Sequence, residues 1–222
     1  IRFAPYIDGD RVYFGADDGY VYCLHLEEGK LLWRYRPSPA DEYVIGNSRM
    51  VSLWPVRTGL IVDKGIVYVG AGVFPYEGLY ICAIDAKTGN EIWKNDTAGD
   101  LAWGLQYGGM APQGYLLASD STLYVPSGRG MPAAFDRQDG HFIRFLSQGG
   151  KTGGSWALMD QDKLIAGVNS QGNPAKIVFD EKTGKRQGDL FAQYPGIDLV
   201  MTDRMAYTVI EGGIVAIDRQ LH

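Results

Sequence analysis

Short runs of apolar residues, separated by polar turns that contain glycine, follow one another along the chain. The segment 80–93, "YICAIDAKTGNEIW", shows the pattern: an apolar run closes on Asp85, a turn follows at Gly89, and a second run ends on Trp93. Gly89 can adopt the positive φ of a tight reversal, so the pattern predicts two antiparallel strands joined by a turn. We find no convincing helical pattern anywhere in the chain.

The same layout occurs five times. The copies are residues 12–33, 67–93, 123–144, 164–185 and 206–220, and a further apolar strand precedes each of them. Repeats of roughly 40–50 residues with four strands each are typical of a β-propeller, in which every unit needs neighbours to bury its two faces. We therefore predict an all-β protein, a β-propeller of four-stranded antiparallel blades. The predicted blades are roughly 1–36, 50–95, 109–146, 154–188 and 197–222.

The spacing A-x-D-x-x-T-G-x-x-x-W within the copies resembles the tryptophan-docking motif of the quinoprotein-like, or PQQ-repeat, propellers. That superfamily includes the pyrroloquinoline quinone (PQQ) dependent alcohol dehydrogenases and the propeller lipoprotein of the outer-membrane β-barrel assembly machinery. The chain resembles the lipoprotein more than the dehydrogenases. The motif positions are Ala83, Asp85, Thr88, Gly89 and Trp93 in the second copy, Gly29 and Trp33 in the first, Asp136 and Gly140 in the third, Asp180 and Gly184 in the fourth, and Asp218 in the fifth.

The resemblance implies that these residues are structural. In the family the tryptophan lies flat between adjacent blades on the glycine turn of its neighbour, while the Asp and Thr side chains hydrogen-bond that turn. A large flat ring buries much apolar area and still carries an N–H that can find a carbonyl. The copies also depart from the motif: Cys23 and His25 stand at the Ala and Asp positions of the first copy, and Arg144 and Gly188 replace the tryptophan in the third and fourth.

The number of copies indicates whether this chain can form a closed propeller ring. About four and a half blades are present, and the quinoprotein-like family usually closes with eight. An open arc would expose sheet faces at both ends, so we expect the chain to be part of an eight-bladed ring, with the rest of its own propeller as a partner. A small complete propeller of four or five blades is the alternative.

Charge and hydropathy exclude some classes of function. The net charge is −5 and no basic cluster is present, which argues against a nucleic-acid partner. No apolar run approaches the length of a membrane span, and no signal peptide is visible. The expectation that the protein works in the periplasm, or otherwise outside the cytoplasm, comes from the family resemblance alone.

The quinone chemistry of the dehydrogenases requires features that this sequence does not show together. The resemblance implies a vicinal Cys-Cys disulfide, Glu and Asn or Asp ligands for Ca²⁺, and a catalytic Asp. The chain has two cysteines, Cys23 and Cys82, which are two free buried thiols or a disulfide. Aligned on the turn glycines they differ by one strand position and should point to opposite faces. We expect no cofactor, no metal and no catalytic residue.

Two long segments between the copies, 36–59 and 95–115, carry the candidate binding residues. Insertions of this length usually sit on one rim of a propeller, where loops carry function. Alignment of the repeats pairs Arg57 with Gln113 at the innermost strand, so we expect both to face a common axial site. The full set of ligand-binding candidates is Arg57, Gln113, Trp54, Trp103, Gln106 and Tyr107. The alternative is that the insertions pack against each other and close the channel.

Two functions remain open from the sequence. The first is a non-catalytic propeller that acts as a binding or scaffold module for a protein or polysaccharide partner, without a membrane span of its own. The second is an enzyme with a central-channel site, either a PQQ-dependent dehydrogenase or a carbohydrate-active propeller. Fold alone cannot choose between them, because propellers carry many unrelated activities.

Overall fold

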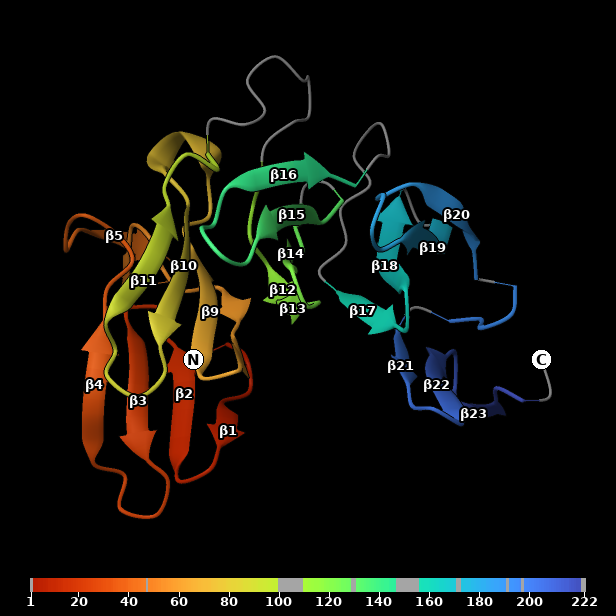
Figure 1. Ribbon diagram of the computed structural model, residues 1–222, viewed down its shortest axis with the longest axis horizontal. Coiled ribbons are helices and arrows are strands. Elements are labelled where there is room, and N and C mark those ends of the chain that lie inside the picture. The colour runs from red at the N-terminus through yellow and green to blue at the C-terminus, as the bar shows by residue number, and fades with distance from the viewer. Residues whose placement is uncertain are drawn as a thin grey trace.

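A computed structural model shows an all-β chain whose sheets follow one another around an arc (Figure 1). The structure describes residues 2–46, 48–99, 110–128, 131–146, 156–170, 173–190, 192–196 and 198–220. Helical structure within these ranges is one 3-10 turn, η1 (Pro75–Glu77), and no helix in them is long and apolar enough to cross a membrane. The all-β class and the repeated four-stranded antiparallel sheets are confirmed.

Each sheet is a meander in which consecutive strands pair antiparallel. The first sheet is β1 (Tyr6–Asp8), β2 (Arg11–Gly15), β3 (Val21–His25) and β4 (Leu31–Tyr35). The second is β8 (Ile61–Asp63), β9 (Ile66–Ala71), β10 (Tyr80–Asp85) and β11 (Glu91–Asn95). The third is β13 (Leu117–Ala118), β14 (Thr122–Val125), β15 (Ala133–Asp136) and β16 (Phe142–Phe145). The fourth is β17 (Ala157–Asp160), β18 (Lys163–Ser170), β19 (Asn173–Asp180) and β20 (Arg186–Asp189). The fifth has three described strands, β21 (Leu199–Met201), β22 (Met205–Ile210) and β23 (Gly213–Asp218).

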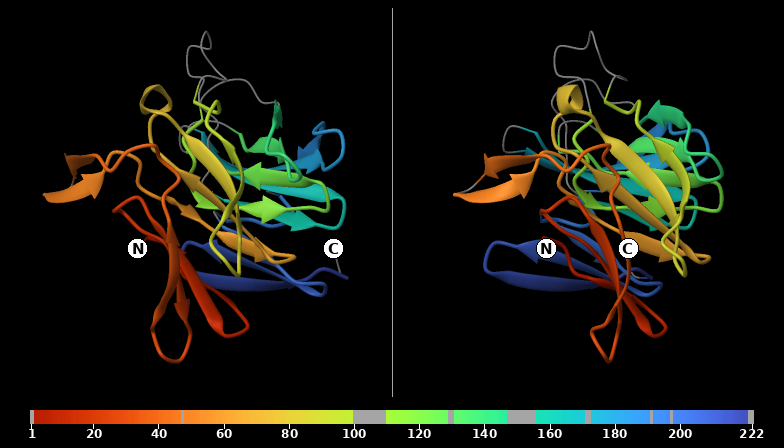
Figure 2. Two further views of the ribbon diagram at one scale, coloured as in Figure 1. Left: turned by 60° about the vertical axis from the view of Figure 1, so that its left-hand side comes forward. Right: turned by 90° about the vertical axis from the view of Figure 1, so that its left-hand side faces the viewer.

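Two short pairings lie outside these meanders. β5 (Tyr43–Gly46) and β6 (Arg49–Ser52) form a separate hairpin, and β7 (Thr58–Gly59) pairs in parallel with β12 (Gly114–Tyr115). The sequence pattern placed the start of the second blade at residue 50. In the structure residues 49–52 belong to the hairpin, and the first strand of the second sheet is β8. The hairpin extends away from the sheets, as Figure 2 shows in orange.

The core lies between neighbouring sheets because both faces of a middle sheet are buried. In β9, Val67 and Val69 pack toward the first sheet, whereas Tyr68 packs toward the third. Successive side chains of a β-strand point to opposite faces of the sheet, and β9 carries apolar side chains on both faces. Separate apolar clusters fill the spaces between the first and second, second and third, third and fourth, and fourth and fifth sheets.

A bulge recurs between the third and fourth strands of every four-stranded sheet. The register shifts at Cys23/Leu24, Ala83/Ile84, Ala134/Phe135 and Val178/Phe179, which in each case is just before the motif position that ends the third strand. A bulge increases the local twist of a sheet. The repeated twist turns the outer strand, and the side chain at the tryptophan position, toward the following sheet.

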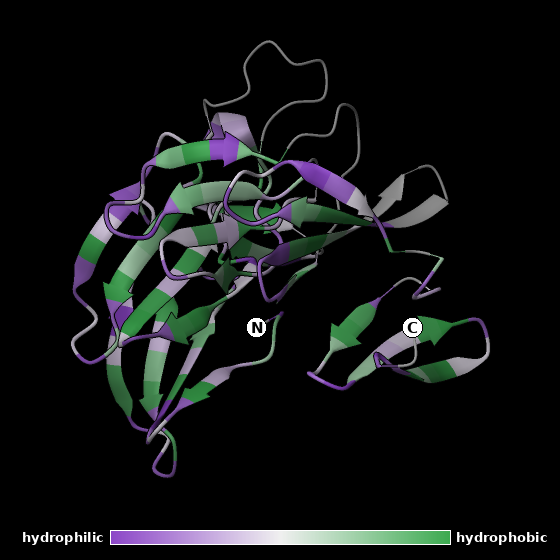
Figure 3. Ribbon diagram, turned by 45° about the vertical axis from the view of Figure 1, so that its right-hand side comes forward, coloured by the Kyte–Doolittle hydropathy of each residue, from purple (hydrophilic) through white to green (hydrophobic). Residues whose placement is uncertain are grey.

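The fifth sheet is the least buried. Its apolar contact with the fourth sheet rests on the buried residues Tyr194, Leu199 and Ala206. On its strands Val200 and Ile214 are 63% and 74% exposed, and Figure 3 shows hydrophobic colour along this sheet. The fifth sheet therefore presents apolar side chains that no described residue covers.

The two cysteines are free and buried. Their predicted orientation toward opposite faces does not separate them: both lie in the apolar cluster between the first and second sheets. The reason is that successive sheets meet through opposite faces. A residue on one face of the first sheet and a residue on the other face of the second sheet enter the same core.

Candidate functional site

Arg57 and Gln113 lie on neighbouring segments at the inner side of the arc. Arg57 directly precedes β7 and Gln113 directly precedes β12, and the parallel pairing aligns Thr58 with Gly114. A cavity of about 270 Å³ opens beside them, which we call the inner cavity. It is lined by Arg2, Phe3, Arg57, Val73, Ala111, Pro112 and Gln113. The structure thus brings together the two residues that the repeat alignment paired.

The N-terminal segment forms one wall of the inner cavity. The Phe3 ring packs edge-on against Tyr115, with 5.1 Å between ring centroids, and the Ala4 backbone N–H donates to the Tyr115 hydroxyl at 3.1 Å. Tyr115 in turn covers Gly59, where an added Cβ would lie only 2.2 Å from the Tyr115 ring. Glycine at 59 therefore allows the close approach that fixes this wall.

Three arginines surround one carboxylate next to the inner cavity. Asp17, in the turn between β2 and β3, accepts hydrogen bonds from Arg2 and from Arg49, both at 2.8 Å. Burial alone would raise the pKa of Asp17, but the hydrogen bond and charge of Arg2, with the charges of Arg49 and Arg57, hold it below its usual value. Asp17 is therefore ionised at neutral pH, and the four groups together carry two net positive charges.

Arg57 is the member of this cluster that pairs with no carboxylate among the described residues. Its Nε atom is buried and has no hydrogen-bond partner among the described residues. Burial lowers the pKa of Arg57, and the positive charges of Arg2 and Arg49 lower it further, while Asp17 opposes the shift. Burial of a cation without a full set of acceptors is unfavourable, so the site has unmet capacity for negative charge.

The other sequence candidates fall elsewhere. Trp54 is 7% exposed, its indole N–H donates to the carbonyl of Glu77, and its ring packs edge-on against Tyr80. It is thus part of the core, not of the cavity lining. Trp103, Gln106 and Tyr107 lie outside the described residues.

The motif residues join adjacent sheets. Trp33 of the first sheet lies over Gly89 of the second, and its indole N–H donates to the Ala86 carbonyl at 3.1 Å. Trp93 lies over Gly140 of the third sheet in the same way, with an N–H bond of 2.9 Å to the Arg137 carbonyl. These two contacts repeat one packing unit along the arc.

Arg144, which stands at the tryptophan position of the third sheet, makes the equivalent contact with different chemistry. Its guanidinium lies over Gly184, and Nη2 donates to the carbonyls of Lys182 at 2.7 Å and Glu181 at 3.2 Å. Gly188, at the tryptophan position of the fourth sheet, has no side chain to dock. The fifth sheet therefore lacks this contact.

Polar contacts supplement the docking rings. The side chain of Asp85 accepts hydrogen bonds from the N–H and hydroxyl of Thr88, both at 2.7 Å, and Asp180 binds Thr183 in the same manner. These bonds hold the pKa of both aspartates below the usual value. His25, at the Asp position of the first sheet, accepts from the Glu28 N–H through Nδ1 at 3.2 Å, so an imidazole takes over this role.

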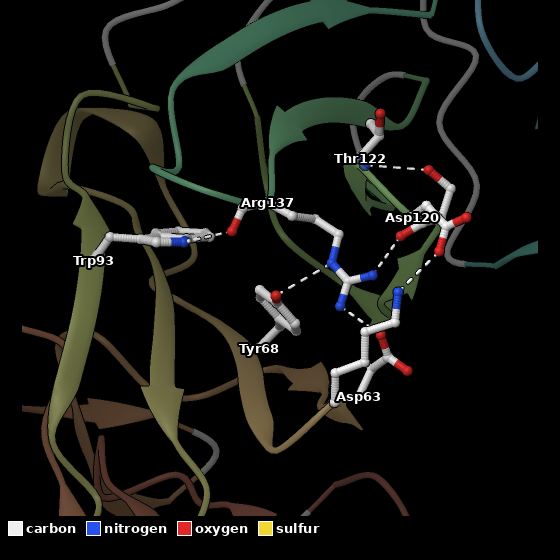
Figure 4. Close-up of polar contacts among 8 residues, drawn as sticks. Asp63, Tyr68, Trp93, Asp120, Thr122 and Arg137 are labelled. Carbon is white, nitrogen blue, oxygen red and sulfur yellow. Dashed lines mark hydrogen bonds and ion pairs between the residues drawn. The ribbon is translucent and has the colours of Figure 1, made fainter.

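Arg137 links the second and third sheets through its side chain as well as its backbone (Figure 4). Its guanidinium donates to the Tyr68 hydroxyl at 3.2 Å, to the Ser119 carbonyl and to the Asp63 carboxylate. The corresponding residue after the last motif aspartate, Arg219, pairs with Asp160. The charges of these arginines are thus neutralised within the fold, unlike that of Arg57.

Sequence reasoning missed most of the residues that line the inner cavity or form the charge cluster beside it. Arg2, Phe3, Asp17 and Arg49 belong to three separate segments, and no repeat or motif connects them. The sequence around Asp17 has the composition of a hairpin turn and carries no other signal. The one available signal was the insertion 36–59, which contributes Arg49 and Arg57.

One cluster has the composition of a metal site. The ligand atoms of Asp136, Asp139 and His141 lie within 4.8 Å of one another on the exposed turn that contains Gly140. Internal hydrogen bonds account for this proximity: Asp136 accepts from the Gln138 N–H, and His141 Nδ1 lies 2.7 Å from Asp139. We assign no metal to it.

Comparison with known proteins places the chain in a family. The family model described as PQQ_2, outer membrane protein assembly factor BamB, matches residues 1–220. The chain belongs to this PQQ-repeat propeller family. The resemblance inferred from the docking motif is thereby confirmed.

Relatives of two kinds match within this family. The chain is 27% identical over 137 residues to outer membrane protein assembly factor BamB of Alkalilimnicola ehrlichii, a match that covers 62% of this chain and 30% of that protein. It is 33% identical over 100 residues to quinohemoprotein alcohol dehydrogenase ADH-IIG of Pseudomonas putida, which covers 45% of this chain and 13% of the relative. The aligned parts of the chain therefore span less than a third of either relative's length.

A solved structure has the same fold. BamB from Moraxella catarrhalis superimposes with a TM-score of 0.62 at 19% sequence identity, covering 97% of this chain and 57% of that one. The sheets of this PQQ-repeat chain thus match part of a known propeller.

The described residues do not fit the quinone and calcium ion of the dehydrogenases. The two cysteines lie on different sheets, so they cannot form a vicinal disulfide. The described lining of the inner cavity includes arginine and glutamine side chains but no carboxylate that could ligate Ca²⁺. We derive no chemical step through the quinone.

Proposed function

We propose that this PQQ-repeat propeller is a non-catalytic binding and scaffold module that works outside the cytoplasm and holds a protein partner. The observation that carries the proposal is the hairpin β5–β6, which projects from the sheets (Figure 2). Its exposed apolar side chains are Tyr43, Val44, Ile45 and Met50, with Ile45 81% and Met50 63% exposed.

The base of the hairpin is bonded to a turn of the first sheet, although its tip is exposed. The Ser52 N–H donates to the Asp17 carbonyl at 2.8 Å and Arg49 pairs with Asp17, while the Leu53 N–H donates to the Glu42 carbonyl at 2.8 Å and closes the base of the hairpin itself. A two-stranded hairpin is marginally stable alone, and exposed apolar clusters on a protein surface commonly mark interaction sites. A fixed base and an apolar tip suit a contact with another protein better than one with a polar polysaccharide.

The chemistry of the inner cavity supports a non-catalytic role. The residues described in its lining include no carboxylate, histidine, serine or cysteine, so they supply no nucleophile and no general base near neutral pH. We also propose that further blades of the same propeller, of which the family usually has eight, cover the apolar fifth sheet. The 57% coverage of the solved BamB chain supports this proposal.

A photocrosslinking experiment in the source organism tests the hairpin. A photoreactive amino acid at position 45 should yield one discrete protein adduct, and Met50→Glu should abolish it. The matched control is the same photoreactive group at the exposed position 186 on β20, which should yield none. Ile45→Glu should leave the melting temperature unchanged because the side chain is 81% exposed.

Two outcomes would contradict the proposal. Adducts of equal yield from positions 45 and 186 would show that the hairpin has no specific partner. Oxidation of an alcohol by the protein with added PQQ, Ca²⁺ and an artificial electron acceptor would show that it is an enzyme.

A further inference from the structure

We propose that the inner cavity is a binding site for a small aliphatic monocarboxylate. The site is separate from the hairpin tip, so its test is independent of the proposed protein partner. Its residues come from the N-terminal segment (Arg2, Phe3), the segment before β7 (Arg57), the segment after β9 (Val73) and the segment before β12 (Ala111–Gln113).

Charge is the first reason. Arg2 and Arg49 share the single carboxylate of Asp17, and Arg57 lies close enough to feel the charge of all three groups. One more negative charge would bring this cluster closer to neutrality. By contrast, the larger cavity beside Arg137, of about 710 Å³, is lined by the cations Lys64, Arg137 and Lys182 and by the carboxylates of Asp63, Asp120, Asp162 and Glu181, with Arg137 paired to Asp63 and Lys64 to Asp120. Of the two, the inner cavity is the one with excess positive charge.

The unpaired donor on Arg57 is the second reason. Guanidinium and carboxylate groups match in geometry, and one carboxylate can accept two parallel N–H bonds from an arginine. The buried Nε of Arg57 has no acceptor among the described residues, although it is a donor in such a pair. Because Nε itself is closed to solvent, a carboxylate in the cavity would supply the missing acceptor once the Arg57 guanidinium turns its Nε edge toward the cavity that it lines. The Gln113 side chain adds an amide to the same wall of the cavity.

The remaining walls indicate the rest of the ligand. Phe3, Val73, Ala111 and Pro112 present apolar surface around the arginine. A strongly hydrated dianion such as sulfate would lose its water against these walls without polar replacement. A short aliphatic chain ending in a carboxylate places its charge on Arg57 and its methylene groups against the apolar side chains. The volume of about 270 Å³ suits a molecule of a few carbon atoms.

Isothermal titration calorimetry at low ionic strength tests the assignment, with sodium butyrate as the probe. We expect one butyrate per chain, and affinity at least tenfold lower for Arg57→Met. Arg49→Met, on the exposed hairpin, should weaken binding by a smaller factor and keeps the test valid if Arg57→Met does not fold. The matched control is Arg186→Met, which removes an exposed arginine from β20 and should bind as the unaltered protein does.

Titrations with related ligands show whether the site recognises the carboxylate, the aliphatic chain or both. Butyramide, which lacks the charge, and sulfate, which lacks the aliphatic chain, should each bind at least tenfold more weakly than butyrate. An N-acetylated alanine dipeptide with a free carboxylate separates the two sources of this group: binding equal to that of butyrate assigns a peptide C-terminus, and weaker binding assigns a free acid. No heat with butyrate, equal binding by Arg57→Met, or sulfate binding as tight as butyrate would each overturn the proposal.

Discussion

Substitution of Gly140 by alanine tests the docking of Trp93 directly. Gly140 has a φ of +76°, and an added Cβ would lie 2.3 Å from Cε3 of the Trp93 ring. The chain offers a matched control: Gly29 occupies the equivalent turn of the first sheet with a φ of +64°, and an added Cβ there meets nothing within 4 Å. The two substitutions share the backbone strain and differ in the presence of the ring.

The expected costs follow from these two effects. A left-handed conformation costs a non-glycine residue about 1–2 kcal/mol, and this applies at both positions. Forcing an extra methyl group into a packed contact adds about 1–3 kcal/mol, and this applies at Gly140 alone. We therefore expect Gly29→Ala to lower the free energy of unfolding by about 1–2 kcal/mol and Gly140→Ala to lower it by about 2–5 kcal/mol.

A double-mutant cycle isolates the contact. Trp93→Ala alone should cost about 3–5 kcal/mol, because it empties a large buried volume and leaves the Arg137 carbonyl without its donor. Once the ring is absent, the methyl group of Gly140→Ala has space, and its cost should fall to the backbone strain. The two substitutions should therefore be non-additive by about 1–3 kcal/mol.

Urea unfolding followed by far-UV circular dichroism measures all four proteins without relying on tryptophan fluorescence, which Trp93→Ala alters. The reasoning is refuted if Gly140→Ala costs no more than Gly29→Ala. It is equally refuted if the cost of Gly140→Ala is the same with and without Trp93.

Two further predictions concern titratable groups. Asp17 has its pKa lowered in the folded state, so its carboxylate contributes stability above the unfolded pKa of about 4, and this contribution is lost as the pH falls through the folded pKa. Asp17→Asn should therefore flatten the acid limb of a plot of urea midpoint against pH; limbs of equal slope would contradict this. Burial raises the pKa of the Cys82 thiol to about 12 and also raises that of Cys23, so both are protonated and shielded at pH 8. A chromogenic disulfide reagent should react with neither cysteine in the native protein and with both after unfolding, whereas rapid native reaction would show an open interface.

The docking motif shows which parts of the structure can be predicted from local sequence. The Asp, Thr and Gly residues of a turn such as 85–89 interact over a few positions, and their hydrogen bonds depend on little beyond the turn itself. The alternation of apolar residues identified the strands for the same reason. Repetition then gave the order of the sheets, since units that cannot bury both faces alone must stack on their neighbours. Even Arg57 and Gln113 could be paired, because they occupy equivalent positions of successive repeats.

Other features depend on how the sheets are turned relative to one another, which no single repeat encodes. The hairpin β5–β6 took a segment that the pattern placed in the second blade, because its pairing partner comes from the same insertion. The cysteines share one core since opposite faces of successive sheets meet.

The arginine cluster is the feature that sequence reasoning could least predict. Arg2, Asp17, Arg49 and Arg57 come from the N-terminal segment, a turn of the first sheet and the insertion. The sequence by itself determined the strands, the turns and the docking residues, because those rest on local hydrogen bonding and alternation. Only the tertiary structure decided where charge collects and where a cavity opens. Electrostatic interactions act through space, and the packing of distant segments sets their distances.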